Sequence, residues 1–489
     1  MLLDSASPKK NNIKPWQDTK VELAPQSSHI SRQFSDILAT YKKLTDESVD
    51  FFSGYKSDYQ QLNDINRTLR QNQLLLNQIK AQHKGKLRAA ASPSKIPVKS
   101  VARLEQQVLD LKKQYRNLNQ RLNQAKQQRW YMLDKIVRKM LTLLISNKSA
   151  TQLLGTILLS APLPEEKVRC SRNERYKPLY IAALVTTFFQ HIQADYTFED
   201  DYIREVMDAL DADIPKEEQS DYKEDILAPL ISAMLLQTIG SYAPEAENIF
   251  RGDRFRALNK EERKLLNKIT KQKSLEYIQL ALGVPEQKFV SRQESELYQF
   301  QQTKRLQFMQ SLILHRDKSD YELRDLMQIP MVYTSYLLST KPEFEYDTTI
   351  KAYQTIEMAI TRKLYFSDYA KRFLNLVGRF PLGCGIYFYS EDTNTVEKAI
   401  VCSLQPEHAD EPVCKQITRY QMQSLSHSEI VVSRKNNVFF PTQSTKQTGR
   451  ALQAFLKTHK TPIWNANEVW DVQVPSSRFW SKDGQCRYV

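Results

Sequence analysis

The sequence predicts a mainly α-helical protein with three parts: a long N-terminal helical hairpin or coiled coil, an all-helical domain, and a small β-rich C-terminal appendage. Two long stretches near the N-terminus repeat apolar residues every three or four positions, which is typical of amphipathic helices. The middle of the chain holds apolar clusters preceded by helix-start residues. Past Gly378, short runs of β-branched and aromatic residues indicate strands.

Changes in residue pattern set the predicted boundaries. Residues 1–30 have too few apolar side chains to offset the entropy of ordering, so we expect them to be disordered. Pro93 and Pro97 end the first long helix. The remaining segments are a long amphipathic helix at 31–85, a linker at 86–100, a basic coiled-coil helix at 101–147, a helical domain at 148–378, a β appendage at 379–440 and an aromatic-anchored tail at 441–489.

The second long helix carries a heptad pattern. From Leu104 to Ile136 its apolar positions alternate by four and three over more than four heptads, which predicts a coiled-coil seam. We expect Leu111, Leu118 and Leu122 to form the central contacts of this seam. An antiparallel hairpin with the first helix, a dimeric coiled coil, or both would bury the stripe.

The positive charge is concentrated in one segment. The chain has a formal net charge of +14, and residues 86–148 hold 15 Lys/Arg against three Asp/Glu. Lys112, Lys113, Arg116 and Arg121 are candidate partner-binding residues. The whole basic face comprises Lys112, Lys113, Arg116, Arg121, Lys126, Arg129, Lys135, Arg138 and Lys139. Protein partners or self-association are favoured over nucleic acid, because few aromatic residues are present there for base stacking.

Several other classes are disfavoured. No run reaches the roughly 20 apolar residues of a membrane span, and no signal peptide is recognisable, so we expect a cytoplasmic protein. The five cysteines show no Cys-x-x-Cys spacing, which disfavours a disulfide framework or thiolate zinc site. The chain also lacks a Gly-rich phosphate loop and the Asp-x-Ser-x-x-Gly pattern of PilZ domains. No cofactor is therefore expected.

Four local segments occur in a recognisable order. Residues 235–240 read Leu-Leu-Gln-Thr-Ile-Gly, and residues 258–266 have the features of a helix start. Residues 333–342 read Tyr-Thr-Ser-Tyr-Leu-Leu-Ser-Thr-Lys-Pro, and residues 380–383 read Phe-Pro-Leu-Gly. Over roughly residues 170–430, this order resembles the HD-GYP family of bacterial cyclic di-GMP phosphodiesterases. The resemblance implies an HD-like fold for the helical domain.

The resemblance also implies where catalytic metal ligands belong. In the family, a His-Asp pair and a later Asp help to bind two or three metal ions; the matching positions here are Gln237, Thr238 and Val332. Between residues 170 and 378 only His191 and His315 remain, and His315 is the candidate relic of the family's paired histidines. Two histidines are too few for such a cluster. We therefore expect a pseudoenzyme without metal and without catalytic residues.

The preferred hypothesis for function is a non-catalytic scaffold or regulatory protein that acts through protein–protein contacts, in bacterial cyclic di-GMP signalling. One alternative is a metal-dependent cyclic di-GMP phosphodiesterase with atypical ligands, which requires at least four converging His, Asp or Glu side chains. A second alternative is a nucleic-acid-binding helical protein, which requires an unobstructed basic face.

Overall fold

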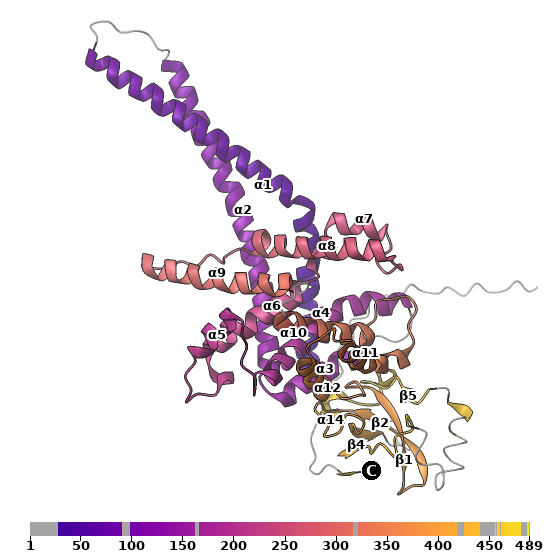
Figure 1. The fold of residues 1–489 in the computed structure, drawn as a ribbon. Coiled ribbons are helices and arrows are strands. Elements are labelled where there is room, and N and C mark those ends of the chain that lie inside the picture. Colours follow the sequence, from indigo (N-terminus) through magenta and orange to yellow (C-terminus); the bar gives the residue numbers. More distant parts are fainter. Residues whose placement is uncertain are drawn as a thin grey trace, which may run out of the picture.

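The structure is a computed structural model that describes residues 28–89, 98–161, 166–315, 321–417, 425–440, 455, 457–459, 461–480 and 487–488. Residues 1–27, most of the segment expected to be disordered, lie outside this part. Figure 1 shows a long two-helix arm, a helical body at its base, and a β module at the far side of the body. The predicted fold class, mainly α with a helical hairpin and a small β appendage, is confirmed.

Helices α1 (His29–Ala89) and α2 (Val98–Leu144) form the antiparallel hairpin. Gly54 is the only glycine of α1 before its last turns, and neither helix contains a proline, so both run uninterrupted. Ion pairs connect the two helices along their length, including Arg121 Nη2 to Asp58 Oδ1 at 2.6 Å and Lys80 Nζ to Glu105 Oε1 at 2.8 Å. These pairs show which levels of the two helices lie side by side.

The base of the hairpin belongs to the core of the helical body. Phe34, Tyr41 and Leu44 of α1 are at most 3% exposed, and Leu133 and Ile136 of α2 are fully buried in the same apolar cluster as the body helices. The core therefore continues across the predicted domain boundary at residue 148. Only the distal half of the hairpin projects from the body (Figure 1).

The helical body is organised around α4, which packs against α3, α6, α10 and α12. Its elements are α3 (Asn147–Leu159), α4 (Glu166–Ile192), α5 (Asp201–Asp208), η1 (Lys216–Glu218), η2 (Tyr222–Leu227), α6 (Ala228–Leu236), η3 (Ile239–Tyr242), α7 (Pro244–Phe250), α8 (Lys260–Glu276), η4 (Tyr277–Leu282), α9 (Arg292–His315), α10 (Tyr321–Leu337), η5 (Tyr346–Ile350), α11 (Lys351–Thr361) and α12 (Ser367–Val377). Among the described residues, the helical segment Tyr222–Tyr242 is long and apolar enough to cross a membrane, and most of it is buried inside the fold.

The β module is a six-stranded sheet with the order β5-β1-β2-β3-β4-β6. Its strands are β1 (Gly385–Ser390), β2 (Thr395–Val401), β3 (Val413–Ile417), β4 (Leu425–Val431), β5 (Ile463–Trp464) and β6 (Arg487–Tyr488). All pairs are antiparallel except β4 with β6.

The C-terminal segment, predicted as an aromatic-anchored tail, supplies β5, η6 (Ala466–Glu468), α14 (Ser476–Phe479) and β6. Its tryptophans connect it to the rest of the chain. Trp464 Nε1 donates a hydrogen bond to the Ile386 carbonyl at 3.1 Å, and Trp480 Nε1 donates to Thr156 Oγ1 at 3.0 Å. The segment therefore completes the sheet and joins it to α3, which the sequence pattern did not predict.

Candidate functional site

The two positions matched to the family's His-Asp pair lie at the end of α6, in a filled part of the core. Gln237 is 2% exposed, and its amide donates to the Met234 carbonyl at 3.3 Å. Ser274 of α8 donates to the Gln237 carbonyl at 3.0 Å. Tyr41 of α1 donates to the Leu235 carbonyl at 3.1 Å, and Thr238 lies near the same tyrosine hydroxyl. Neighbouring helices thus occupy the surroundings of this pair.

The other matched positions lie on different helices. Val332 is a half-buried residue of α10, and α10 and α6 both pack against α4. His315 is the last residue of α9, and its side chain lies outside the described part of the chain. Among the described residues, no group of three or more His, Cys, Asp or Glu side chains could hold a metal ion. The described side chains therefore do not form a metal centre at these positions.

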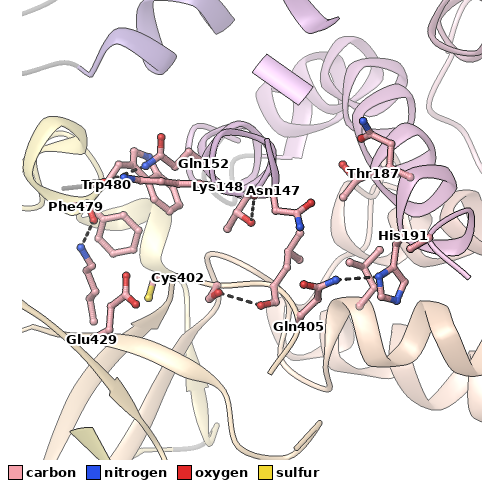
Figure 2. Close-up of a pocket in the computed structure, with 17 residues that line it drawn as sticks. Asn147, Lys148, Gln152, Thr187, His191, Cys402, Gln405, Glu429, Phe479 and Trp480 are labelled. Carbon is pink, nitrogen blue, oxygen red and sulfur yellow. Dashed lines mark hydrogen bonds between the residues drawn. The ribbon is translucent and has the colours of Figure 1, made fainter. Parts of the chain in front are cut away.

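A cavity of about 500 Å³ lies where the helical body meets the β module. We call it the junction cavity, and Figure 2 shows the residues that line it. They come from the start of α3, the end of α4, the loop after β2, the inner face of the sheet, and α14. The lining residues are Asn147, Lys148, Thr151, Gln152, Thr187, Gln190, His191, Ala194, Leu376, Cys402, Ser403, Leu404, Gln405, Lys415, Glu429, Phe479 and Trp480.

The sheet places one lysine and one glutamate in this cavity. Lys415 of β3 pairs with Ile400 on one side and with Glu429 of β4 on the other, so all three lie on the same sheet face. Lys415 is 2% exposed, and its Nζ donates to the Phe479 carbonyl at 2.6 Å. Glu429 is half-buried and makes no ion pair or hydrogen bond with the described residues.

The opposite wall is built by the first turn of α3. Ser146 caps this helix, because its side chain accepts a hydrogen bond from the Ser149 amide at 3.2 Å. Asn147 and Lys148 are exposed on the first turn, and Lys148 has no acidic partner among the described residues. Gln152 lies one turn further along α3, and its amide donates to the Trp480 carbonyl at 3.0 Å.

The end of α4 contributes His191, whose Nδ1 lies 2.9 Å from the Gln405 amide nitrogen (Figure 2). Burial, together with the nearby positive charge of Arg372, lowers the pKa of His191 below its ordinary value of 6.5. The ring is therefore neutral at neutral pH and contributes hydrogen bonding instead of charge. No sequence pattern connects His191 with Gln405 in the loop after β2, because the two residues are 214 positions apart.

The basic residues predicted to bind a partner fall into two groups. Lys112, Lys113 and Arg116 have no acidic partner among the described residues, whereas Arg121 is bound to Asp58. Nearer the body, Arg129 is 8% exposed, and its guanidinium binds Glu47 Oε1 at 2.6 Å. Arg129 belongs to the predicted basic face by sequence, but the structure buries its guanidinium against Glu47, so its charge does not lie on the surface.

The predicted seam residues lie between the hairpin helices. Leu118 is 8% exposed, and Leu111 and Leu122 are half-buried.

Comparison with known proteins adds no relative: no family model, curated protein or solved structure matches this chain. The resemblance to the HD-GYP family stays a prediction.

Proposed function

We propose that this protein is a non-catalytic adaptor that binds an acidic protein partner through the distal part of its hairpin. We define this distal arm as residues 60–81 of α1 and 101–121 of α2. The observation that supports the proposal is a set of unpaired basic side chains on an element that projects from the body (Figure 1). The arm has eight Lys/Arg and only three Asp/Glu. A role in cyclic di-GMP signalling stays a prediction from the resemblance alone.

The arm also exposes apolar surface. Leu74 and Leu75 of α1 are 63% and 47% exposed, and Leu109 of α2 is 58% exposed. The ion pairs of the hairpin place these leucines at the same level along the arm, since Lys80 binds Glu105 and Arg121 binds Asp58. Apolar side chains beside unpaired cations suit an acidic protein surface that is itself partly apolar.

Nucleic acid is the competing partner. A phosphate backbone would use the same cations, but single-stranded binding surfaces also present aromatic side chains for base stacking. The distal arm has one aromatic residue, Tyr115, and exposed leucines in place of further rings. These features favour a protein partner.

The non-catalytic part of the proposal is supported by the residues at the matched positions. Gln237 and Thr238 offer no anionic ligand, and their neighbours are Tyr41 and Ser274 instead of other metal-binding groups. A hydrolytic metal cluster requires several imidazoles and carboxylates around one point. The described residues do not bring such a set together.

The test is charge reversal on the arm. The variant Lys112→Glu, Lys113→Glu, Arg116→Glu changes three exposed or half-buried, unpaired residues. The control variant Lys268→Glu, Arg362→Glu, Lys371→Glu changes the net charge equally at three exposed, unpaired positions on the body. We expect proteins captured from nuclease-treated native lysate to be lost with the arm variant and retained with the control.

Duplex DNA binding is measured in parallel by fluorescence anisotropy. We expect only weak binding at physiological salt. Tight binding that the arm variant abolishes, with a log-log salt slope of about 0.9 for each phosphate neutralised, would replace the adaptor proposal with a nucleic-acid function. Equal protein capture by the arm variant and the wild type would contradict any role of the arm in binding.

A further inference from the structure

We propose that the junction cavity binds a small zwitterionic ligand of the amino-acid class, with its ammonium group at Glu429 and its carboxylate at the first turn of α3. This inference concerns a different surface from the distal arm. It therefore does not depend on the adaptor proposal.

Glu429 defines the cationic end of the ligand. Glu429 is a half-buried residue that lines the cavity, and its carboxylate has no partner among the described residues. The neighbouring Lys415 does not form an ion pair with it there, since the Lys415 ammonium donates to the Phe479 carbonyl at 2.6 Å. A partly desolvated carboxylate is stabilised by a hydrogen-bonded cation. A ligand ammonium or guanidinium would provide that cation.

The start of α3 defines the anionic end. The Ser149 backbone amide already donates a hydrogen bond to the Ser146 side chain. The backbone amides of Asn147 and Lys148 have no acceptor among the described residues. Free amides and the positive end of a 13-residue helix favour an anion. The unpaired Lys148 ammonium and the Asn147 side chain line the same part of the cavity. A ligand carboxylate would accept hydrogen bonds from these groups.

The charges of the wall disfavour ligands of a single sign. A simple anion would be repelled by Glu429, and a simple cation would be repelled by Lys148 and the buried Lys415. His191 adds no charge at neutral pH, because it is held neutral by burial and by Arg372. The volume of about 500 Å³ lies within the ordinary range of roughly 300–1,000 Å³ for small-molecule sites, and it leaves room for a side chain.

The consequence of binding follows from the position of the cavity. Glu429 belongs to the β module, and Lys148 belongs to the helical body. A ligand that contacts both would stabilise the junction between these two parts, and the bound protein would unfold at a higher temperature.

The experiment uses the full chain and a fixed set of probes. Glycine, L-serine, L-glutamate, L-lysine and L-arginine are compared with methylamine, acetate and inorganic phosphate, by thermal shift and by isothermal titration calorimetry. We expect at least one amino acid to raise Tm and to bind with a measurable Kd, while methylamine and acetate at equal concentration have no effect.

The variants Glu429→Gln and Lys148→Gln each remove one charge from the wall, and we expect each to weaken that binding by about tenfold or more. Glu343→Gln and Lys371→Gln are matched controls at exposed, unpaired positions, and they should bind as the wild type does. If circular dichroism shows that Glu429→Gln does not fold, the affinity of Lys148→Gln alone tests the proposal. Lys148 is exposed on the first turn of α3, so its substitution should not prevent folding.

Three outcomes would overturn the proposal. One is that no amino acid stabilises the protein. Another is that both wall variants bind as tightly as the wild type. The third is that acetate or phosphate binds as well as any amino acid and binds more tightly to Glu429→Gln, which would identify a simple anion site.

Discussion

At the scale of single residues, Gly240 shows how a motif residue serves packing. A Cβ atom at this position would lie 2.2 Å from the Thr270 carbonyl oxygen and 2.6 Å from the Ser274 amide nitrogen, both backbone atoms of α8. The Gly240 amide also donates to Ser274 Oγ at 3.0 Å. Glycine at the end of the Leu-Leu-Gln-Thr-Ile-Gly segment is therefore required by the close approach of η3 to α8, with or without a metal.

The first prediction compares two glycines. We expect Gly240→Ala to lower the free energy of unfolding by about 1–3 kcal/mol, because backbone atoms of α8 must move away from the new methyl group. Gly54→Ala is the control: nothing lies within 4 Å of its added Cβ, and alanine favours the helix by about 0.5–1 kcal/mol. Urea denaturation of both variants measures the difference. If Gly240→Ala and Gly54→Ala change the free energy of unfolding equally and in the same direction, then Gly240 is not in close contact with the α8 backbone.

Lys415 illustrates what sequence can and cannot tell about the site. Along β3, Lys415 is two residues from both Val413 and Ile417, so strand periodicity places this lysine on the same face as two apolar residues, which is an unusual position for a charged side chain. This position of Lys415 is therefore a signal in the sequence for a buried lysine, although the sequence analysis above does not include it. In contrast, no periodicity could show that this face lies opposite the first turn of α3, because residues 148 and 415 are brought together only by the packing of the body on the sheet.

At the scale of elements, the hairpin is stable because each helix covers the apolar stripe of the other. Leu76, Val108 and Leu118 are between 6% and 9% exposed along the distal arm, whereas Leu109 is 58% exposed. The heptad pattern predicted a buried seam on α2, but it left open whether α1, a second copy of the chain, or both would cover that seam. It could not show that the base of the hairpin enters the body, because Phe34 and Tyr41 would have the same spacing against any apolar partner.

The second prediction tests the seam. Leu118→Asp places an unpaired carboxylate between α1 and α2, at a cost on the order of several kcal/mol. We expect faster hydrogen exchange in both arm helices and a loss of helicity. Leu109→Asp is the matched control, and its effect should stay within about 0.5 kcal/mol because this side chain already faces solvent. Identical exchange in the two variants would mean that Leu118 is not buried.

The third prediction concerns the ion network that joins α1 to α7 and α8. Lys273 is 6% exposed, and its Nζ lies 2.8 Å from Glu276 Oε2, 3.1 Å from Glu245 Oε1 and 2.9 Å from the Tyr55 hydroxyl. Lys56 also binds Glu245, at 2.7 Å. We expect Lys273→Met to lower the free energy of unfolding at pH 7 by about 1–3 kcal/mol, because two carboxylates lose their shared cation.

The network also predicts a pH dependence. Burial alone would raise the pKa of Glu245, but hydrogen bonds from Lys56 and Lys273 outweigh it and lower this pKa from 4.5 to about 2; the pKa of Glu276 is lowered for a similar reason. As pH falls from about 4.5 towards 2, the unfolded chain binds protons first, so stability is lost in that window. Lys273→Met should flatten this loss, and Lys268→Met on the exposed side of α8 should not.

At the scale of the whole molecule, the periodicity of apolar residues in the sequence predicted the helices and strands better than it predicted how they pack together. The change of pattern at Gly378 separated the helical part from the sheet, since glycine at a φ of +66° ends α12. The role of the last segment was harder to predict, because β5 and β6 are two residues each and their pairing depends on β1 and β4. Short strands of this kind carry no periodicity of their own.

The last prediction concerns catalysis by the whole protein. We expect purified protein to contain well below one equivalent of iron, manganese or zinc and not to hydrolyse cyclic di-GMP, because Gln237, Thr238 and Val332 occupy the matched ligand positions. Restoring the pair with Gln237→His and Thr238→Asp should give neither metal nor activity, and it should lower stability because Gln237 is 2% exposed. Elemental analysis, a turnover assay and thermal melting measure these outcomes.

Stoichiometric metal together with EDTA-sensitive hydrolysis in the wild type would contradict the adaptor proposal and favour a phosphodiesterase with atypical ligands. Metal binding gained only in the double variant would show instead that the surrounding core tolerates a metal site, and that the two side chains alone had removed it.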